Sequence, residues 1–421
     1  MRQPVVRSAA SRYASLLSDA RYLMLITSSF LYALGFYFFT WFLPILILRD
    51  YGAWCLGLTY AISTAVGLLA VVSGVASDVF GYKYLILGVP AFTAVSYIAL
   101  LIKHNIFTVL LVAIALHVTA LGGPPLSALL SVIVERSALG MAFSLYRLVM
   151  MVGFTVSSTL MAVVTQFFGL SSALLMGLPL ITACILLRAA LLRGVEPGCW
   201  SEHRSEQNVK NALREHLAAM LKALGVYGAL TLLSFSLINA LALSYDPFLY
   251  NFIKYVLGLN IVFLGVYESL STVVNAALQP VAGTIVDRVG VNAIKYALCA
   301  ETLLSVVITV IGSCVSGQYS SLLVTIALAL ILAYELSGSV LSNAINVGVA
   351  LMTRAEFRGS SYGLLTSLSS LLSMPMYVMF AYAWSMSPAT VPLYYGLLTL
   401  VPLAIGYVGE RLHVKKAVVR V

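Results

Sequence analysis

The sequence predicts an all-α integral membrane protein with twelve transmembrane helices, arranged as two pseudo-symmetric six-helix bundles. Three observations lead to this fold class: an apolar composition, a series of long apolar runs, and one loop motif that occurs twice at half-chain spacing. The 421 residues are 61% hydrophobic and 9% charged, whereas a soluble domain is about 25% charged. This composition excludes a soluble enzyme, a nucleic-acid-binding module and a disordered chain.

Apolar runs bounded by charged residues, glycine or proline divide the chain into twelve segments. A helix needs about 20 apolar residues to cross a bilayer, and each run is long enough. Six runs precede the longest polar stretch, at residues 22–48, 54–76, 84–102, 105–133, 138–165 and 171–192. Six more follow it, at residues 222–253, 259–282, 294–313, 319–352, 359–385 and 390–409.

The polar stretch at residues 194–221 separates an N-terminal bundle at 1–193 from a C-terminal bundle at 222–421. The second half of this stretch carries apolar side chains on one helical face: Val209, Leu213, Leu217 and Met220. That pattern predicts an amphipathic helix. We expect the helix to lie at the cytoplasmic interface and to connect the two bundles.

The basic residues predict the orientation in the membrane. Of the 24 Lys and Arg residues, only Arg49, Lys103 and Lys254 fall in outer segments, and Arg147 falls inside a span; all the others fall in cytoplasmic segments. Cytoplasmic loops are enriched in Lys and Arg. We therefore expect a multi-pass protein of the cytoplasmic membrane with both termini cytoplasmic. The net charge of +9 is a topology signal, and no nucleic-acid partner is expected.

One loop motif occurs after the second span and again after the eighth. Residues 74–81 and residues 283–290 both read G-x-x-x-D-x-x-G. Gly52 and Gly258 also open the second span of their respective halves. A glycine permits a tight loop and a close helix approach, and an aspartate at a helix end can accept bonds from a neighbouring helix N-terminus.

The two motifs resemble the signature loop of the major facilitator superfamily, G-x-L-x-D-R-x-G-R-[KR]. The resemblance covers the whole chain: twelve spans, a six-plus-six division and the loop in both halves. The first copy departs from the pattern with Val79 in place of arginine, and the second copy lacks the trailing basic pair. The resemblance implies a latch in which loop charges hold the cytoplasmic face shut. Its expected members are Gly74, Asp78, Gly81, Lys83, Gly283, Asp287, Arg288, Gly290, Arg136 and Arg358.

Ionisable residues inside spans are costly and usually face a cavity or a partner. They are His117, Arg147, Asp246, Glu268, Glu301 and Glu335. In the family the first, fourth, seventh and tenth helices line the central cavity, and the ninth lies outside. We therefore expect Glu301, on the ninth helix, to reach toward the interface or a loop arginine and to have no transport role.

Glu335 is the strongest candidate for a substrate or proton site. It lies deep in the tenth span, and polar residues follow it at helical spacing: Ser339, Ser342, Asn343 and Asn346. His117 occupies nearly the equivalent position in the N-terminal half. A carboxyl in a low-dielectric site suits proton binding and release. A structural interhelical hydrogen bond is the alternative for Glu335 and equally for His117.

Two further sets of residues complete the predicted site. On the seventh span, Asn239 and Asp246 share a face, and Pro247 is expected to kink the helix beside Asp246. On the fifth and eighth spans, Arg147 and Glu268 are candidates for an ion pair between the halves. A hydrated Asp246 near the outer interface is the competing interpretation.

The resemblance implies a secondary transporter, not an enzyme, that moves a small organic solute by alternating access. The chain has no G-x-x-x-x-G-K-[ST] motif, so an ion gradient drives transport or the carrier equilibrates its solute. We expect protons as the coupling ion, efflux favoured over uptake, no cofactor, no metal, and a monomer in the lipid bilayer. A uniporter, an uptake symporter and a non-transporting sensor are the alternatives. The charge of the solute stays open, because Phe36 or Tyr37 would suit an organic cation, while Arg147 and His117 permit an anion.

Overall fold

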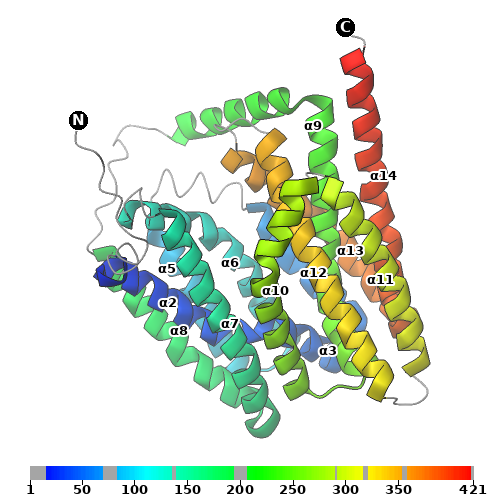
Figure 1. Cartoon of the computed structure of the whole chain (residues 1–421). Coiled ribbons are helices and arrows are strands. Elements are labelled where there is room, and N and C mark those ends of the chain that lie inside the picture. Colours follow the sequence, from blue (N-terminus) through cyan, green and yellow to red (C-terminus); the bar gives the residue numbers. More distant parts are fainter. Residues whose placement is uncertain are drawn as a thin grey trace. The chain divides into compact units, whose positions relative to one another are not determined.

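The computed structural model describes residues 16–69, 83–134, 139–193, 206–289, 292–315, 321–352 and 358–418. Within these ranges every regular element is a helix (Figure 1). Contacts between helices group the chain into two compact units. Unit 1 comprises Met1–Thr40 and Ser73–Ser201, and unit 2 comprises Trp41–Val72 and Glu202–Val421.

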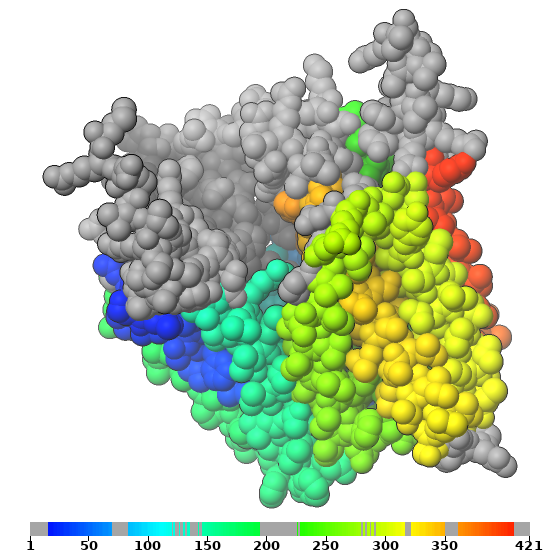
Figure 2. All heavy atoms as spheres, in the orientation of Figure 1, coloured from blue at the N-terminus to red at the C-terminus, as the bar shows by residue number. Residues whose placement is uncertain are grey.

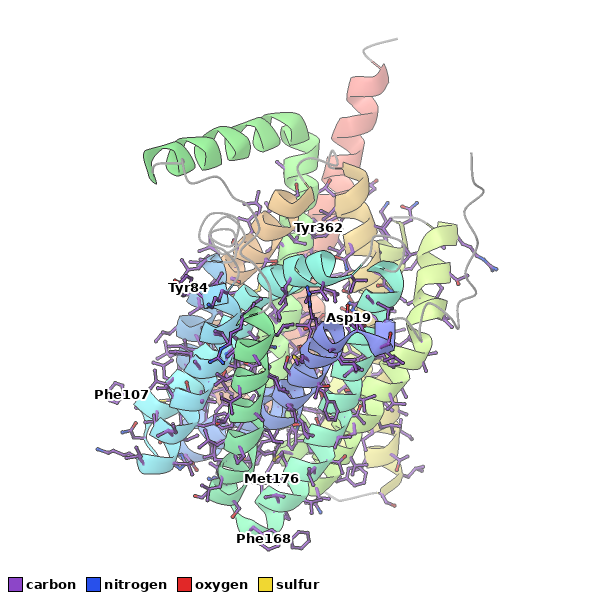
Figure 3. All side chains as sticks on the ribbon, turned by 90° about the vertical axis from the view of Figure 1, so that its left-hand side faces the viewer. Asp19, Tyr84, Phe107, Phe168, Met176 and Tyr362 are labelled. Atoms are coloured by element: carbon purple, nitrogen blue, oxygen red, sulfur yellow. The ribbon has the colours of Figure 1, made fainter. Side chains whose placement is uncertain are left out.

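Unit 1 is built around α2, which packs against α7 and α8, and around α5, which packs against α6 and α8. Its helices are α2 (Ala20–Phe36), α5 (Lys83–Ile102), α6 (Ile106–Ile133), α7 (Leu139–Phe168) and α8 (Leu170–Arg193). The Asp19 carboxylate caps α2 by accepting the Arg21 amide at 2.8 Å. Asp19 lies toward one end of this unit and Phe168, the last residue of α7, lies at the other (Figure 3). The Tyr22 hydroxyl ties α2 to α7 by donating to the Ala142 carbonyl at 2.9 Å.

Unit 2 is organised around α9, which packs against α13 and α14, and around α11, which packs against α12 and α14. Its long helices are α9 (Glu206–Asn251), α10 (Ile261–Val289), α11 (Ala293–Val315), α12 (Ser321–Met352), α13 (Arg358–Met386) and α14 (Val391–Val418). Short helical turns join them: η3 (Phe252–Val256) and η6 (Pro388–Thr390). The long helix α3 (Phe38–Thr64) and the turn η1 (Ala65–Leu69) lead into this unit from unit 1.

The glycines that open the second span of each half adopt the same unusual backbone conformation. Gly52 has a φ of 82° and interrupts α3, and Gly258 has a φ of 73° just before α10. Other residues adopt a positive φ only at a steric cost. The sequence repeat therefore corresponds to a structural one, since each glycine turns the chain between the first and second span of its half.

The connector helix predicted after residue 194 is present at the start of α9. The backbone is helical from Glu206, and Gly225, with a φ of 60°, separates this part from the rest of α9. Figure 1 shows α9 changing direction between these two parts. The seventh predicted span thus begins after Gly225, a few residues later than the composition suggested.

The second predicted span packs within unit 2. The ring of Tyr60 lies 5.5 Å from the ring of Tyr377 on α13, and the Ser367 hydroxyl donates to the Leu68 carbonyl at 3.3 Å. By contact this segment therefore groups with the C-terminal helices. The division of the chain into bundles at 1–193 and 222–421 stays a prediction.

Ten stretches among the described residues are long and apolar enough to cross a membrane, and the first, Ala20–Leu69, continues through the Gly52 break. Large apolar side chains are exposed on the outer faces of α10, α11 and α12, including Leu270, Val310 and Leu322. Figure 2 shows these helices forming a continuous face of unit 2. Such a face suits contact with lipid tails. The all-α membrane fold is confirmed, and the count of twelve crossings stays a prediction.

Candidate functional site

A cavity of about 450 Å³ lies within unit 2, and we call it the acidic cavity. Five helices, α9 to α13, contribute to its walls. Its polar lining residues are Asn239, Asp246, Asn275, Glu301, Glu335, Ser339, Ser342, Thr366 and Ser369. Its other lining residues are Ile238, Ala242, Leu243, Tyr334, Gly338 and Leu341. The cavity thus combines carboxylates with a partly apolar wall, as small-molecule sites commonly do.

Asp246 reaches the cavity from α9, next to Pro247. Proline lacks an N–H, so the carbonyl four residues earlier, that of Leu243, loses its helical partner. The Tyr377 hydroxyl of α13 donates to this carbonyl at 2.9 Å. Because the freed acceptor is satisfied, α9 remains helical through Pro247 to Asn251. Asn239 and Asp246, which are predicted to share a face, both line the cavity.

Glu335 reaches the cavity from the middle of α12. Asn275 on α10 lies within hydrogen-bonding reach of its carboxyl group. The Ser339 hydroxyl, one turn further along α12, donates to Asn275 Oδ1 at 2.9 Å. Asn275 therefore connects α10 to two cavity residues of α12. Sequence reasoning missed it, although it lies two turns beyond Glu268 on the same helical face.

Glu301 is also part of the cavity, and the expectation that it reaches an interface or a loop arginine is wrong. Its side chain is 1% exposed, and its Oε2 accepts a hydrogen bond from the Tyr395 hydroxyl of α14 at 2.6 Å. The reason is the packing of α11, which lies against both α12 and α14. The buried face of α11 therefore carries Glu301 inward.

Three tyrosines pack together beside these carboxylates. The rings of Tyr245 and Tyr395 stack with centroids 4.4 Å apart. Tyr334 contacts both rings edge-on, at 5.7 Å and 5.4 Å. Of the three, Tyr334 lines the cavity. This cluster holds the Tyr395 hydroxyl in position for Glu301.

The polar stripe predicted on α12 reaches the cavity only in part. Ser339 and Ser342 line it together with Glu335, whereas Asn343 and Asn346 are not among its lining residues. The Asn346 carbonyl instead accepts a hydrogen bond from the Tyr362 hydroxyl at 2.8 Å. Asn343 lies about 80° around the helix from Glu335, and Asn346 lies about 16 Å further along it. Helix geometry therefore takes both asparagines out of reach.

Glu268 and Arg147 are not cavity residues. The Tyr250 hydroxyl donates to Glu268 Oε1 at 3.5 Å, a long contact, and Glu268 is absent from the cavity lining. Arg147 is exposed on α7. Because they belong to different compact units, their ion pair stays a prediction.

His117 lies half-buried on α6 in unit 1. Its ring Nδ1 donates to the Ala113 carbonyl, one turn earlier on the same helix, at 3.0 Å. This local bond favours the structural alternative for His117. A role in proton binding stays a prediction.

Arg188 is one of the charges predicted on the cytoplasmic side, and its side chain lies buried within unit 1. Its side chain is 3% exposed and lies over the ring of Tyr32, 5.6 Å from the centroid. Its Nη1 donates to the Ile86 carbonyl at 3.1 Å. The end of an apolar run does not mark the point where a helix leaves the protein core, so α8 carries this arginine into unit 1.

The predicted cytoplasmic latch is described only in part. Gly74, Asp78, Gly81, Arg136 and Gly290 lie outside the described residues. Of the remaining members, Lys83 starts α5 and Arg358 starts α13, while Gly283, Asp287 and Arg288 belong to the last turns of α10. Lys83 and Arg288 are exposed. The pairing of these charges stays a prediction.

The lining of the cavity determines its chemistry. Among the described residues it contains three carboxyl groups, those of Asp246, Glu301 and Glu335, and no Lys, Arg or His. Asp246 lies close enough to the other two for electrostatic repulsion. In a low-dielectric site such groups hold a proton or bind a cation. Among the described residues no group of three His, Cys, Asp or Glu side chains is arranged to hold a metal ion.

Apolar helices surround this polar cavity. Comparison of the chain with known protein families identifies the family to which it belongs. The family model of the Major Facilitator Superfamily matches residues 25–375. The chain therefore belongs to the Major Facilitator Superfamily and has the fold of its transporters. No curated protein matches the chain significantly.

Similar solved structures include two kinds of transporter, one for nucleosides and one of the POT family. The nucleoside transporter NupG superposes with a TM-score of 0.72 at 12% identity, over 93% of this chain and 99% of that one. The POT family transporter PepTSo superposes with a TM-score of 0.71 at 13% identity, over 93% of this chain and 97% of that one. At these identities the likeness shows the fold alone.

Proposed function

We propose that this protein is a proton-coupled secondary transporter that exports a small organic solute across the cytoplasmic membrane by alternating access. The observation that carries the proposal is the acidic cavity, in which Asp246, Glu301 and Glu335 share one space within an apolar unit. Its volume of about 450 Å³ lies in the range of small-molecule sites.

The carboxyl groups supply the proton-binding chemistry. Three carboxyl groups side by side repel one another when ionised, which favours the binding of a proton or a cation. Each can therefore take up a proton from one side of the membrane and release it after the cavity opens to the other side. Glu335 is the principal proton carrier in this proposal, with Asp246 and Glu301 beside it.

The shared cavity supports exchange rather than co-transport. If solute and proton occupy the same space, each leaves when the other binds. Alternating binding of this kind moves the two in opposite directions. An inward proton gradient then drives the solute outward, which favours export over uptake.

The experiment is flux into reconstituted vesicles with an acidic lumen that contains a pH-sensitive dye. The added solutes are a primary amine, a quaternary ammonium, a carboxylate, a nucleoside and a dipeptide; the last two reflect the substrates named for the similar structures. We expect one class to enter while the lumen becomes alkaline. Protein-free vesicles correct for passive permeation, and vesicles containing Glu335→Gln should show no coupled signal.

The alternatives give different results in the same vesicles. Uptake that ignores the pH gradient would indicate a uniporter. Uptake that requires an acidic exterior would indicate a symporter. Binding without flux of any solute would indicate a sensor. Each of these results would overturn the proposal.

A further inference from the structure

The hydrogen bonds made by the cavity residues indicate the chemical class of the solute. The following inference rests on the proposed function, because it names the class of solute for the same site. Its starting point is a surplus of acceptors. Among the described residues, no donor bonds to the Asp246 carboxyl group, which lines the cavity. The Oε1 atom of Glu301 has no described donor either, since Tyr395 binds Oε2.

The buried position of Glu301 makes its free oxygen informative. The side chain is 1% exposed, so its remaining oxygen meets little besides the cavity. Oε1 lies 3.9 Å from the point where a Cβ on Gly338 would stand, and both residues line the cavity. A carboxylate oxygen that receives no hydrogen bond from the protein can accept one from a ligand in the cavity, and such charge-assisted bonds are strong.

Three hydroxyl groups of the cavity cannot supply those donors, because they already donate to other groups. The Ser369 hydroxyl donates to the Leu365 carbonyl at 2.7 Å, and the Thr366 hydroxyl donates to the Tyr362 carbonyl at 3.0 Å. The Ser339 hydroxyl donates to Asn275. Among the described lining residues, the side chains of Asn239 and Ser342 are available to bind a polar substituent of the solute.

The aromatic lining distinguishes between kinds of cation. A quaternary ammonium group has no N–H and is recognised by several ring faces. Among the residues that the structure describes, one aromatic ring, that of Tyr334, lines this cavity. The rings of Tyr245 and Tyr395 stack on each other at 4.4 Å. Acceptors therefore outnumber available ring faces, which favours a cation that carries N–H donors.

We propose that the acidic cavity binds a protonated primary or secondary amine, whose N–H groups donate to Asp246, Glu301 Oε1 and Glu335. The body of the solute lies along Ile238, Leu243 and Leu341. Protons compete with the amine, since a protonated carboxyl group no longer attracts a cation. Amine affinity therefore falls as the pH falls.

Other titratable groups surround these carboxyl groups. On the helices packed around the cavity they are Tyr60, Tyr245, Tyr250, Tyr267, Glu268, Tyr334, Tyr377 and Tyr395. Tyrosine ordinarily titrates near pH 10, so the carboxyl groups dominate the response near neutral pH.

The test is the thermal stability of the purified wild-type protein with matched probes at pH 7.5. The amines are butylamine, cyclohexylmethylamine and 2-phenylethylamine, which are protonated at this pH. The matched probes are trimethyl(2-phenylethyl)ammonium, 2-phenylethanol and 3-phenylpropionate. A bound ligand raises the melting temperature by mass action. We expect stabilisation by at least one amine, a smaller effect of the quaternary compound, and none from the alcohol or the carboxylate.

The variants assign the effect to the cavity. Asp246→Asn should weaken amine binding about tenfold or more, as expected for the loss of a charge-assisted hydrogen bond. Asp50→Asn is the matched control, because Asp50 pairs with Arg49 at 2.6 Å and does not line the cavity. The wild-type probe series keeps the test decisive even if Asp246→Asn fails to fold.

Three results would overturn the inference: equal or better stabilisation by the quaternary compound, equal or better stabilisation by the neutral or anionic probes, or no stabilisation by any of the amines. The vesicle experiment separates this failure from failure of the proposed function. Proton-coupled flux of a neutral or anionic solute would leave the transporter intact and refute the amine. Amine binding without proton movement would support the amine as ligand and refute the proton-coupled transporter.

Discussion

Arg188 in unit 1 and Asp246 in unit 2 are both ionisable side chains carried into apolar helical bundles, and the protein treats them differently. Arg188 is buried within unit 1, where it lies over the Tyr32 ring and donates to the Ile86 carbonyl. Asp246 borders a cavity and has no donor among the described residues. The comparison teaches that an intramembrane charge indicates function when it borders a space and lacks a partner.

The largest effect should come from the carboxyl groups that border the cavity. Asp246→Asn and Glu335→Gln should each abolish coupled transport, because each removes a group that binds protons and solute. Stability should hold or rise, since the change removes repulsion among the cavity carboxyl groups. Vesicle flux together with melting temperature checks this. If both variants still coupled solute transport to proton movement, the cavity carboxyl groups would not be the functional charges.

The next effect concerns Glu301, whose partner is Tyr395. Tyr395→Phe removes the donor to Oε2 and leaves a second buried oxygen unsatisfied, at a cost of about 1–3 kcal/mol. We expect a lower melting temperature that recovers as the pH falls, because a protonated Glu301 loses the need for the donor. Thr399→Val is the matched control on the same helix, since its hydroxyl pairs with Thr302 and not with a carboxylate. A pH-independent loss in Tyr395→Phe would contradict a proton on Glu301.

Arg188→Lys should produce a smaller change, which lowers stability and leaves amine binding unaffected. Lysine keeps the charge but lacks the planar group that covers the Tyr32 ring, and we expect a loss of about 1 kcal/mol in stability. Amine affinity should not change, because Arg188 is part of unit 1 and not of the cavity lining. Melting curves with and without 2-phenylethylamine measure both quantities. A loss of amine affinity would mean that Arg188 belongs to the site.

An effect of similar size is expected at Tyr377, which supports Asp246 indirectly. Tyr377→Phe removes the donor to the Leu243 carbonyl and should cost about 1 kcal/mol. Since this bond compensates for Pro247, the variant Tyr377→Phe with Pro247→Ala should lose less than the sum of the single changes. Strict additivity would show that the two residues act independently.

The fold could be predicted from the sequence because its signals are local or repeated. Long apolar runs indicate spanning helices, and two copies of one loop motif indicate two related halves. The positive φ values of Gly52 and Gly258 follow from the same repeat. The grouping of the second span with α13 could not be predicted, because it depends on contacts between distant segments such as Tyr60 and Tyr377.

The candidate site could be predicted only where helix periodicity determines it. Glu335, Asp246 and Asn239 line one cavity, as polar positions on apolar helices suggested. Glu301 was excluded because the resemblance placed its helix on the outside, and only the packing of α11 against α12 and α14 reveals its direction. Asn275 was overlooked because a single asparagine is a weaker signal than a charge.

The most direct test of the account is proton exchange on solute binding, measured with the purified protein in a weakly buffered detergent solution near neutral pH. Addition of 2-phenylethylamine should release protons into solution, because the amine displaces them from the cavity carboxyl groups. The release should vanish in Asp246→Asn, remain in Asp50→Asn, and be absent with 2-phenylethanol. Binding of the amine without any release of protons would contradict the claim that proton and solute share one cavity.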